Sequence, residues 1–236
     1  MYEKVSSMEP MLPTQKLEHL EDLSIELCAK ATALTLQFRP ELIRAIGDLV
    51  RSMNCFYSNL IEGHYTYPID IDRALKEQYD TNPEKRELQF EAKAHIEVQK
   101  EIDDGNFWSV DNLSSKEFIS KIHYEFYTRL PDSLRYISYK NGQDKEEVIP
   151  GALRDKGAAV GEHIAPLSSS LNAFLKRFED TYQLDKHSKL KQIIVVAASH
   201  HRLLWIHPFA DGNGRAVRLF SHALLKKVLL QNQWIK

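Results

Sequence analysis

Hydrophobic residues along most of the chain recur at intervals of three and four, the spacing of one face of an α-helix. This pattern predicts helices over Thr14–Phe38, Pro40–Met53, Pro83–Ile102, Asn112–Arg129 and Lys189–Ile206. The last range contains a β-branched run, but its eighteen residues include no Gly or Pro, which favours a buried helix over a strand. We therefore expect an all-α protein.

Helix-breaking and capping residues set the limits of these elements. Pro40 suits the first turn of a helix, and Ser114 or Ser115 suits the N-cap of the helix that follows. Gly63 and Gly105 are expected at helix C-termini. We expect a loop over His64–Ile71, which contains two tyrosines and a proline.

Two further stretches lack a helical pattern. The polar segment Lys140–Glu147 contains an Asn-Gly pair and predicts a turn. Pro150–Pro166 has glycines at positions 151, 157 and 161 and a proline at each end, which predicts a short hairpin.

Composition and charge narrow the class of protein. The chain has 236 residues, enough for one sizeable core or a core with a small helical bundle. A net charge of −2 gives no support for nucleic-acid or membrane binding. No signal-peptide pattern or membrane-spanning run is present, so we expect a cytoplasmic protein; export by a specialised bacterial system stays open. Cys28 and Cys55 are expected to be buried reduced thiols.

The chemistry concentrates in twelve residues, His207–Arg218. A histidine can take a proton near neutral pH, and a carboxylate four residues later can bind Mg²⁺. Glycines allow backbone N–H groups to approach an anion, and a helix starting at about Gly214 would add its positive N-terminal end. Two arginines one helical turn apart can face the same phosphate. The residues concerned are His207, Asp211, Gly212, Asn213, Gly214, Arg215 and Arg218.

These twelve residues, called the signature below, resemble the Fic family motif His-x-Phe-x-(Asp/Glu)-Gly-Asn-Gly-Arg-x-x-Arg at every fixed position. The resemblance implies transfer of a nucleoside monophosphate, usually AMP from Mg-ATP, onto a hydroxyl side chain of a target protein. It makes His207 the base, Asp211 the Mg²⁺ ligand and Arg218 the γ-phosphate ligand. Gly212–Arg215 would form the anion hole for the α- and β-phosphates. Family members that act as kinases carry a bulkier, lysine-containing segment in place of Gly-Asn-Gly-Arg.

A second segment, Ser58–Gly63, resembles the family's inhibitory motif, (Ser/Thr)-x-x-x-Glu-(Gly/Asn). The resemblance implies an inhibitory helix at about residues 54–63, in which Glu62 pairs with Arg218 and occupies the space of the γ-phosphate. Because the motif precedes the signature in the same chain, self-inhibition is implied. In some relatives the same glutamate positions a water molecule that removes AMP.

The glycine-rich segment at about residues 147–166 resembles the family flap, a hairpin that covers the nucleotide and pairs with an extended segment of the target. Val160, Gly161, Glu162 and His163 match flap positions that line the nucleotide in relatives. For His163, a solvent-facing position in a surface loop is an equal alternative.

The expected architecture is a Fic-type helical core over residues 106–236, with a short β-hairpin flap, preceded by an N-terminal helical region over 1–105. Relatives continue past the signature helix with helices that contact adenosine, so the chain is either truncated or builds its base pocket differently. We expect a self-inhibited protein adenylyltransferase that binds Mg²⁺, ATP and a target protein. Modification of the chain by itself and its assembly as a homo-oligomer stay open.

Two other classes of function remain open. One is different chemistry at the same site, either removal of AMP through Glu62 or transfer from another donor such as UTP or CDP-choline. The other is a non-catalytic interaction module. Intact His207 and Asp211 count against the module, because a binding protein needs neither.

Overall fold

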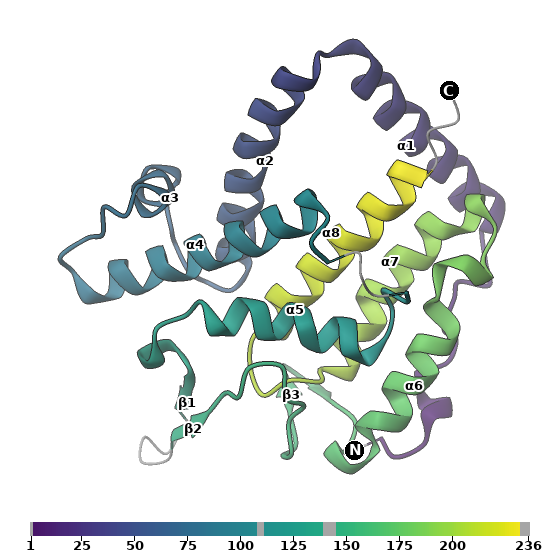
Figure 1. Ribbon diagram of the computed structural model, residues 1–236. Helices are drawn as coiled ribbons and strands as arrows, with labels where there is room; N and C mark the ends of the chain where they lie inside the picture. Colours follow the sequence, from purple (N-terminus) through teal and green to yellow (C-terminus); the bar gives the residue numbers. More distant parts are fainter. Residues whose placement is uncertain (1, 108–110, 139–144, 232–236) are drawn as a thin grey trace.

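The computed structural model describes residues 2–107, 111–138 and 145–231. Within them the protein is helical with two small antiparallel hairpins (Figure 1). The all-α expectation is confirmed. The α-helices are α1 (Leu17–Gln37), α2 (Pro40–Ile61), α3 (Pro68–Leu75), α4 (Pro83–Asp104), α5 (Lys116–Thr128), α6 (Leu171–Tyr182), α7 (Lys189–Ile206) and α8 (Asn213–Gln231). Single 3₁₀ turns lie at Val5–Met8, Asp132–Leu134, Ser168–Ser170 and Leu184–Lys186.

The main core surrounds α8, which lies between α5, α7 and the C-terminal half of α4 (Figure 1). Its largest buried side chains are aromatic and come from α5, α6, α8, the residues after α4, and the loop between α7 and α8: Phe107, Phe118, Phe126, Tyr127, Phe174, Phe178, Tyr182, Phe209 and Phe220. Aromatic burial of this extent holds the start of α8 in a fixed position, which matters because the signature lies there.

The N-terminal helices pack against this core in two places. α1 lies against α7, whereas α2, α3 and α4 share a small apolar cluster formed by Cys55, Ile71, Ala92 and Ile96. α4 also enters the main core, so it joins the two clusters. In Figure 1, α1 and α2 form an arch whose top stands away from α8. Both cysteines are free; Cys55 is buried and Cys28 is half-buried.

Several predicted boundaries are confirmed and others are wrong. Ser115 is the N-cap of α5, with its side chain accepting from the Phe118 N–H at 3.1 Å. The predicted loop His64–Ile71 ends early, because Pro68 begins α3, a position that needs no backbone N–H. The helix predicted to end at Met53 instead runs on to Ile61, so the inhibitory segment is the last part of α2. The amphipathic helix α6 was not predicted.

The two hairpins are shorter than ordinary β-structure. β1 (Tyr136–Ser138) pairs with β2 (Lys145–Glu147), and β3 (Ala159–Val160) pairs with β4 (His163–Ile164). The second hairpin confirms the predicted hairpin within Pro150–Pro166. The predicted turn over Lys140–Glu147 falls partly outside the described residues, and its last three residues form β2. Among the described residues, the apolar runs within helices are too short to cross a membrane.

Candidate active site

The signature forms a tight loop between two helices. His207 is the C-cap of α7 with φ 51°, and its N–H donates to the Leu203 carbonyl at 3.1 Å. α8 begins at Asn213, one residue before the predicted start. The first helical bond of α8 runs from the Ala216 N–H to the Gly212 carbonyl, so the amides before it are free of helical partners. The loop therefore presents an N-terminal helix end to the site.

His207 has the ionisation state that a general base would need. Burial lowers its pKa below the ordinary histidine value, and the Arg154 guanidinium lowers it further, against a backbone hydrogen bond with Leu204. The imidazole is therefore neutral at pH 7, the form that accepts a proton.

Asn213 and Phe209 hold the loop in shape. The Asn213 side chain accepts from the Phe209 N–H at 2.9 Å and donates to the Phe209 carbonyl at 2.8 Å. The Phe209 ring is fully buried and stacks on His123 with a centroid separation of 3.9 Å. The Asn213 amide is thus used within the loop, and only its backbone N–H is left to face an anion.

The two glycines are required for different reasons. Gly212 has φ 72°, and a Cβ there would lie 2.5 Å from the Tyr127 ring. Gly214 has an ordinary φ, but a Cβ there would collide with Glu62 Oε1. Glu62 therefore lies directly against the first turn of α8, in the space that an anion at this helix end would use.

Asp211 is fixed by two donors. Tyr127 Oη donates to Asp211 Oδ2 at 2.6 Å, and Arg215 Nη2 donates to the same oxygen at 3.1 Å. Burial raises the pKa of Tyr127, so the phenol stays protonated and donates. The carboxylate is half exposed and can offer its other oxygen to a cation. A hard cation such as Mg²⁺ fits one carboxylate beside an anion site, with phosphate oxygens and water completing its shell.

Histidines elsewhere do not form a metal site. His200 Nδ1 lies 2.7 Å from Ser221 Oγ, and the described part of the chain contains no group of three potential metal-ligating side chains.

Sequence reasoning missed three residues that support the loop. Glu91 on α4 forms a buried ion pair with Arg215. His123 on α5 accepts from the Gly151 N–H through Nδ1 at 2.9 Å and donates from Nε2 to the Asp211 carbonyl at 3.1 Å. Tyr127, one helical turn beyond His123, stacks on that ring. A signal existed, because His123 and Tyr127 are polar-tipped aromatics four residues apart on one helix face.

The inhibitory motif and the signature meet. Arg218 Nη2 donates to Glu62 Oε1 at 2.6 Å, and Arg218 Nε donates to Ser58 Oγ at 2.8 Å. Ser58 also accepts through its backbone carbonyl at 3.3 Å. Ser58 and Glu62, four residues apart at the end of α2, thus hold the same guanidinium.

Arg154 joins the flap to the signature loop. Its Nε donates to the His207 carbonyl at 2.7 Å, and its backbone N–H donates to the Pro208 carbonyl at 2.9 Å. A further guanidinium nitrogen donates to the Pro166 carbonyl at 2.7 Å, at the far end of the flap. A single buried side chain therefore fixes both ends of the flap against the loop.

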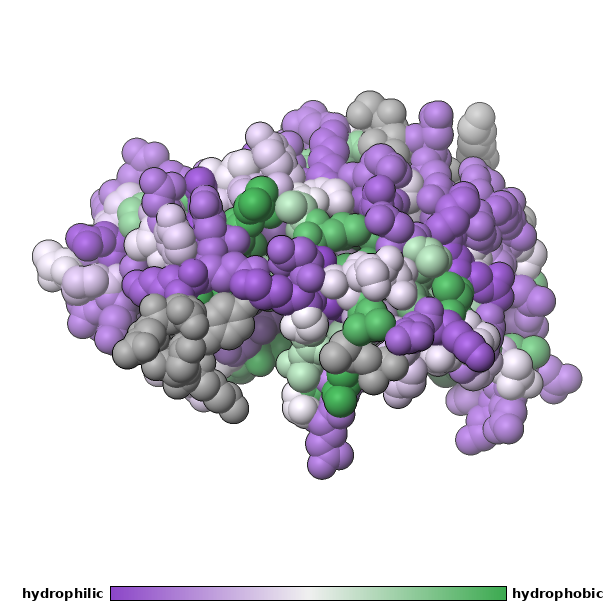
Figure 2. All heavy atoms as spheres, turned by 90° about the horizontal axis from the view of Figure 1, so that it is seen from below, coloured by the Kyte–Doolittle hydropathy of each residue, from purple (hydrophilic) through white to green (hydrophobic). Residues whose placement is uncertain are grey.

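The flap residues have different environments. Val160 and Glu162 are exposed, and Gly161 has φ 59°, which turns the hairpin. His163 is half-buried: Nε2 lies 2.9 Å from the Trp205 carbonyl, and the ring stacks on Tyr2. Seen from the hairpin side (Figure 2), apolar residues show toward the middle of this face, bordered by hydrophilic ones.

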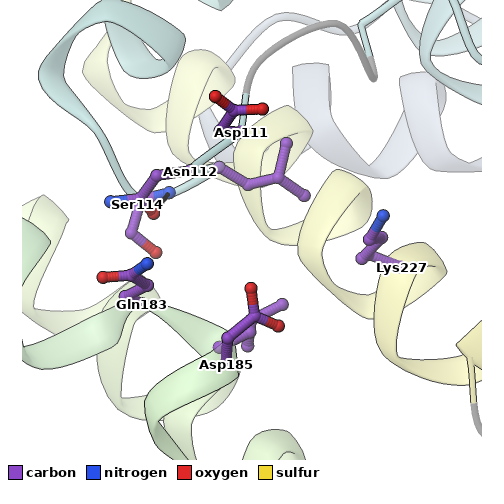
Figure 3. Close-up of a pocket in the computed structure, with 8 residues that line it drawn as sticks. Asp111, Asn112, Ser114, Gln183, Asp185 and Lys227 are labelled. Carbon is purple, nitrogen blue, oxygen red and sulfur yellow. Dashed lines mark hydrogen bonds between the residues drawn. The ribbon is translucent and has the colours of Figure 1, made fainter.

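A separate hollow lies between the segment that precedes α5, the segment that follows α6, and Lys227 of α8 (Figure 3). Its volume of about 30 Å³ suits a water molecule at most. Ser114 Oγ donates to the Tyr182 carbonyl at 2.7 Å, which is a structural contact. This hollow is not a candidate site.

Comparison with known proteins agrees with the geometry. Residues 112–225 match the family model described as Fic/DOC family. Two relatives, both named protein adenylyltransferase Fic, are from Drosophila willistoni, 38% identical over 77 residues, and Drosophila mojavensis, 30% identical over 128 residues. The matches cover 33% and 54% of this chain but 16% and 25% of those relatives, so the chain aligns with a minor part of each.

Solved structures show the same fold. A Fic family protein from Desulfovibrio desulfuricans superimposes with a TM-score of 0.63 at 19% identity, over 91% of this chain and 58% of that one. A Fic domain containing signaling protein from Bacteroides thetaiotaomicron gives 0.65 at 19% identity, over 86% and 72%. At this identity the likeness concerns the fold alone.

Proposed function

We propose that the protein is a protein adenylyltransferase that transfers AMP from Mg-ATP to a hydroxyl side chain of a target protein, because residues 112–225 match the model of the Fic/DOC family. The observation that carries the proposal is the arrangement at one loop of a neutral base, a half-exposed carboxylate and a free helix N-terminus. Transfer of this kind depends mainly on positioning and on neutralising phosphate charge, which these groups supply.

In this mechanism His207 takes the proton of the target hydroxyl as its oxygen attacks the α-phosphorus, and the bond to the β-phosphate breaks to release pyrophosphate. The amides of Gly212–Arg215 hold the α- and β-phosphates. Asp211 would hold Mg²⁺, which neutralises the phosphate oxygens. Val160–His163 would lie along the nucleotide, and the edge of β3 would pair with the target backbone.

Self-inhibition follows from Glu62. Its carboxylate takes up Arg218 and lies against Gly214, so a γ-phosphate cannot share the same guanidinium without displacing it. The Glu62 carboxylate and the γ-phosphate are both negatively charged and repel each other. This repulsion would move the α-phosphate out of line for attack. Loss of the carboxylate would free Arg218 for the nucleotide.

Label transfer from α-³²P-ATP with Mg²⁺ tests the proposal, with wild type, Glu62→Gly and Glu62→Gly/His207→Ala. We expect label on the chain itself or on added lysate protein with Glu62→Gly, and little with wild type. Removing the base should reduce the label ~10²–10⁴-fold while leaving ATP binding nearly unchanged.

A folded Glu62→Gly variant that transfers no label would refute AMP transfer. If pre-labelled protein instead loses AMP more rapidly with wild type than with Glu62→Gly, the site acts as an AMP-removing hydrolase. Parallel lanes with UTP and GTP identify another donor.

A further inference from the structure

Glu91 is a buried carboxylate that neither the base nor the inhibitory pair uses. It lies on α4, in the N-terminal part of the chain, and only 5% of its surface is exposed. One oxygen, Oε2, accepts from His64 Nδ1 at 2.6 Å, and the other contacts Arg215. Glu91 thus joins a residue just beyond α2 to the first arginine of the signature.

Arg215 needs this partner because it is buried as well, with 7% of its surface exposed. Burial lowers its pKa to about 10, so it remains charged at pH 7. A buried guanidinium without a counter-charge is strongly destabilising, since neither water nor protein neutralises it. Its ring contact with Phe126, at 5.2 Å from the centroid, further fixes the plane of the group.

The second terminal nitrogen of the Arg215 guanidinium contacts Asp211, the candidate metal ligand. Nη2 lies 3.1 Å from Asp211 Oδ2 and 3.5 Å from Tyr127 Oη. Without Glu91, the guanidinium would be drawn towards Asp211, its remaining carboxylate partner, and would compete with a cation for it. With Glu91 present, Arg215 is held back and Asp211 keeps one oxygen free.

We propose that Glu91 is a positioning residue of the active site, which sets Asp211 for Mg²⁺ by neutralising and orienting Arg215. The proposal rests on the function proposed above. In this proposal the N-terminal helices support catalysis through Glu91, in addition to inhibiting it through Glu62. Relief of inhibition by displacing the whole region would therefore also remove the support of Asp211, whereas a local displacement of Glu62 would not.

The test compares Glu91→Gln with Asp103→Asn, both in the Glu62→Gly/His207→Ala background, which binds nucleotide without turnover. Asp103 is the matched control: it also lies on α4 and pairs with Arg51 and with His222 of α8, but it does not touch the signature loop. Mn²⁺ binding in the presence of ATP is measured by electron paramagnetic resonance, and unfolding temperature is measured on the same samples.

We expect Glu91→Gln to weaken Mn²⁺ binding by up to ~10–100-fold, the range for disturbing an outer partner of a metal ligand, because Arg215 is that partner and loses its position without Glu91. Asp103→Asn should lower the unfolding temperature without changing Mn²⁺ binding. In the Glu62→Gly background with His207 intact, Glu91→Gln should raise the Mg²⁺ concentration needed for half-maximal transfer by a similar factor. If Glu91→Gln does not fold, Glu91→Asp keeps the charge on a shorter side chain and should weaken Mn²⁺ binding several-fold.

Equal Mn²⁺ affinity in the Glu91 variant and its Asp103 control overturns the proposal, whatever the transfer assay gives. Absence of any Mn²⁺ binding in the parent overturns it as well. If the parent binds Mn²⁺ and Glu91→Gln weakens it, but no label is transferred, then Glu91 positions the metal ligand and the proposed AMP transfer is wrong.

Discussion

His207 combines a left-handed backbone conformation with a lowered side-chain pKa. Its backbone has φ 51°, a left-handed conformation that costs free energy for a residue with a Cβ. Its ring is half-buried with the pKa lowered. The turn ends α7 and directs the chain into the loop, while Arg154 holds the His207 carbonyl from the flap side. The loop contacts thus compensate for the backbone conformation that places the ring in the site.

The lowered pKa predicts the pH dependence of transfer. A base must be neutral, so activity is lost as pH falls through the pKa of His207, below the ordinary value of 6.5. We expect kcat/KM of Glu62→Gly to be level around pH 7 and to decline only at lower pH. The measurement is the pH profile of kcat/KM. ATP binding by Glu62→Gly/His207→Ala over the same pH range is the control, because it reports ionisation of the nucleotide in the absence of His207. If kcat/KM already declines with falling pH above pH 7, His207 is not the base.

At the scale of elements, the end of α2 sets the position of Glu62. Gly63 has φ 80°, its N–H donates to the Leu60 carbonyl at 3.0 Å, and the His64 N–H donates to the Asn59 carbonyl at 2.8 Å. These two bonds form a Schellman motif, which ends the helix immediately after Glu62. The Glu62 carboxylate is thus held on a well-defined final turn.

Gly63→Ala should weaken that turn. No atom lies near a Cβ at this position, so the cost is the backbone strain alone, ~1 kcal/mol. We expect a slightly lower unfolding temperature and more label transfer than wild type, though less than Glu62→Gly gives. Gly47→Ala is the control, because Gly47 lies earlier in α2, lacks a positive φ, and a Cβ there would meet Arg51 Nη1 at an ordinary 3.7 Å. Transfer equal to wild type would show that the turn does not restrain Glu62.

Sequence periodicity predicted the elements with strong local signals and missed those that depend on tertiary contacts. Local patterns predicted α7, the start of α8 and the C-cap at Gly63, and they gave Ser114 or Ser115 as the N-cap of α5. The pairing of Glu62 with Arg218 was implied by the resemblance to the Fic family. Glu91 was missed because a lone glutamate on a charged helix is typical of a solvated face, and only packing shows that it is buried. The inhibitory function of Glu62 and the nucleotide contacts of the flap remain predictions, since contact geometry does not measure activity.

At the scale of the whole molecule, buried polar groups lie where α2 and α4 meet α8. His95 of α4 is 3% exposed, and its Nδ1 has no hydrogen-bond partner among the residues that the structure describes. It lines a pocket of about 310 Å³ that also reaches Ser58 and Arg218. Burial lowers the pKa of His95 to about 3, so the ring stays neutral in the folded protein.

This histidine makes stability depend on pH. Between its folded pKa of about 3 and its ordinary value of 6.5, the unfolded state binds more protons, so stability is lost as pH falls below 6.5. At pH 5 the loss is about 2 kcal/mol. We expect His95→Leu to reduce the drop in unfolding free energy between pH 7 and pH 5. His19→Gln is the control, because His19 is exposed. If the unfolding free energy of His95→Leu falls between pH 7 and pH 5 as much as that of wild type, the pH dependence comes from other groups.

α2 is a single helix of 22 residues, ~33 Å long, with no proline after its first residue. A continuous hydrogen-bonded helix bends little, so a tilt imposed at one end becomes a displacement at the other. The end that carries Glu62 holds Arg218; the opposite half presents apolar side chains to solvent, namely Leu42, Ile43, Ile46, Leu49 and Val50. A tilt of α2 imposed at its exposed half would therefore change the distance between the Glu62 carboxylate and the Arg218 guanidinium.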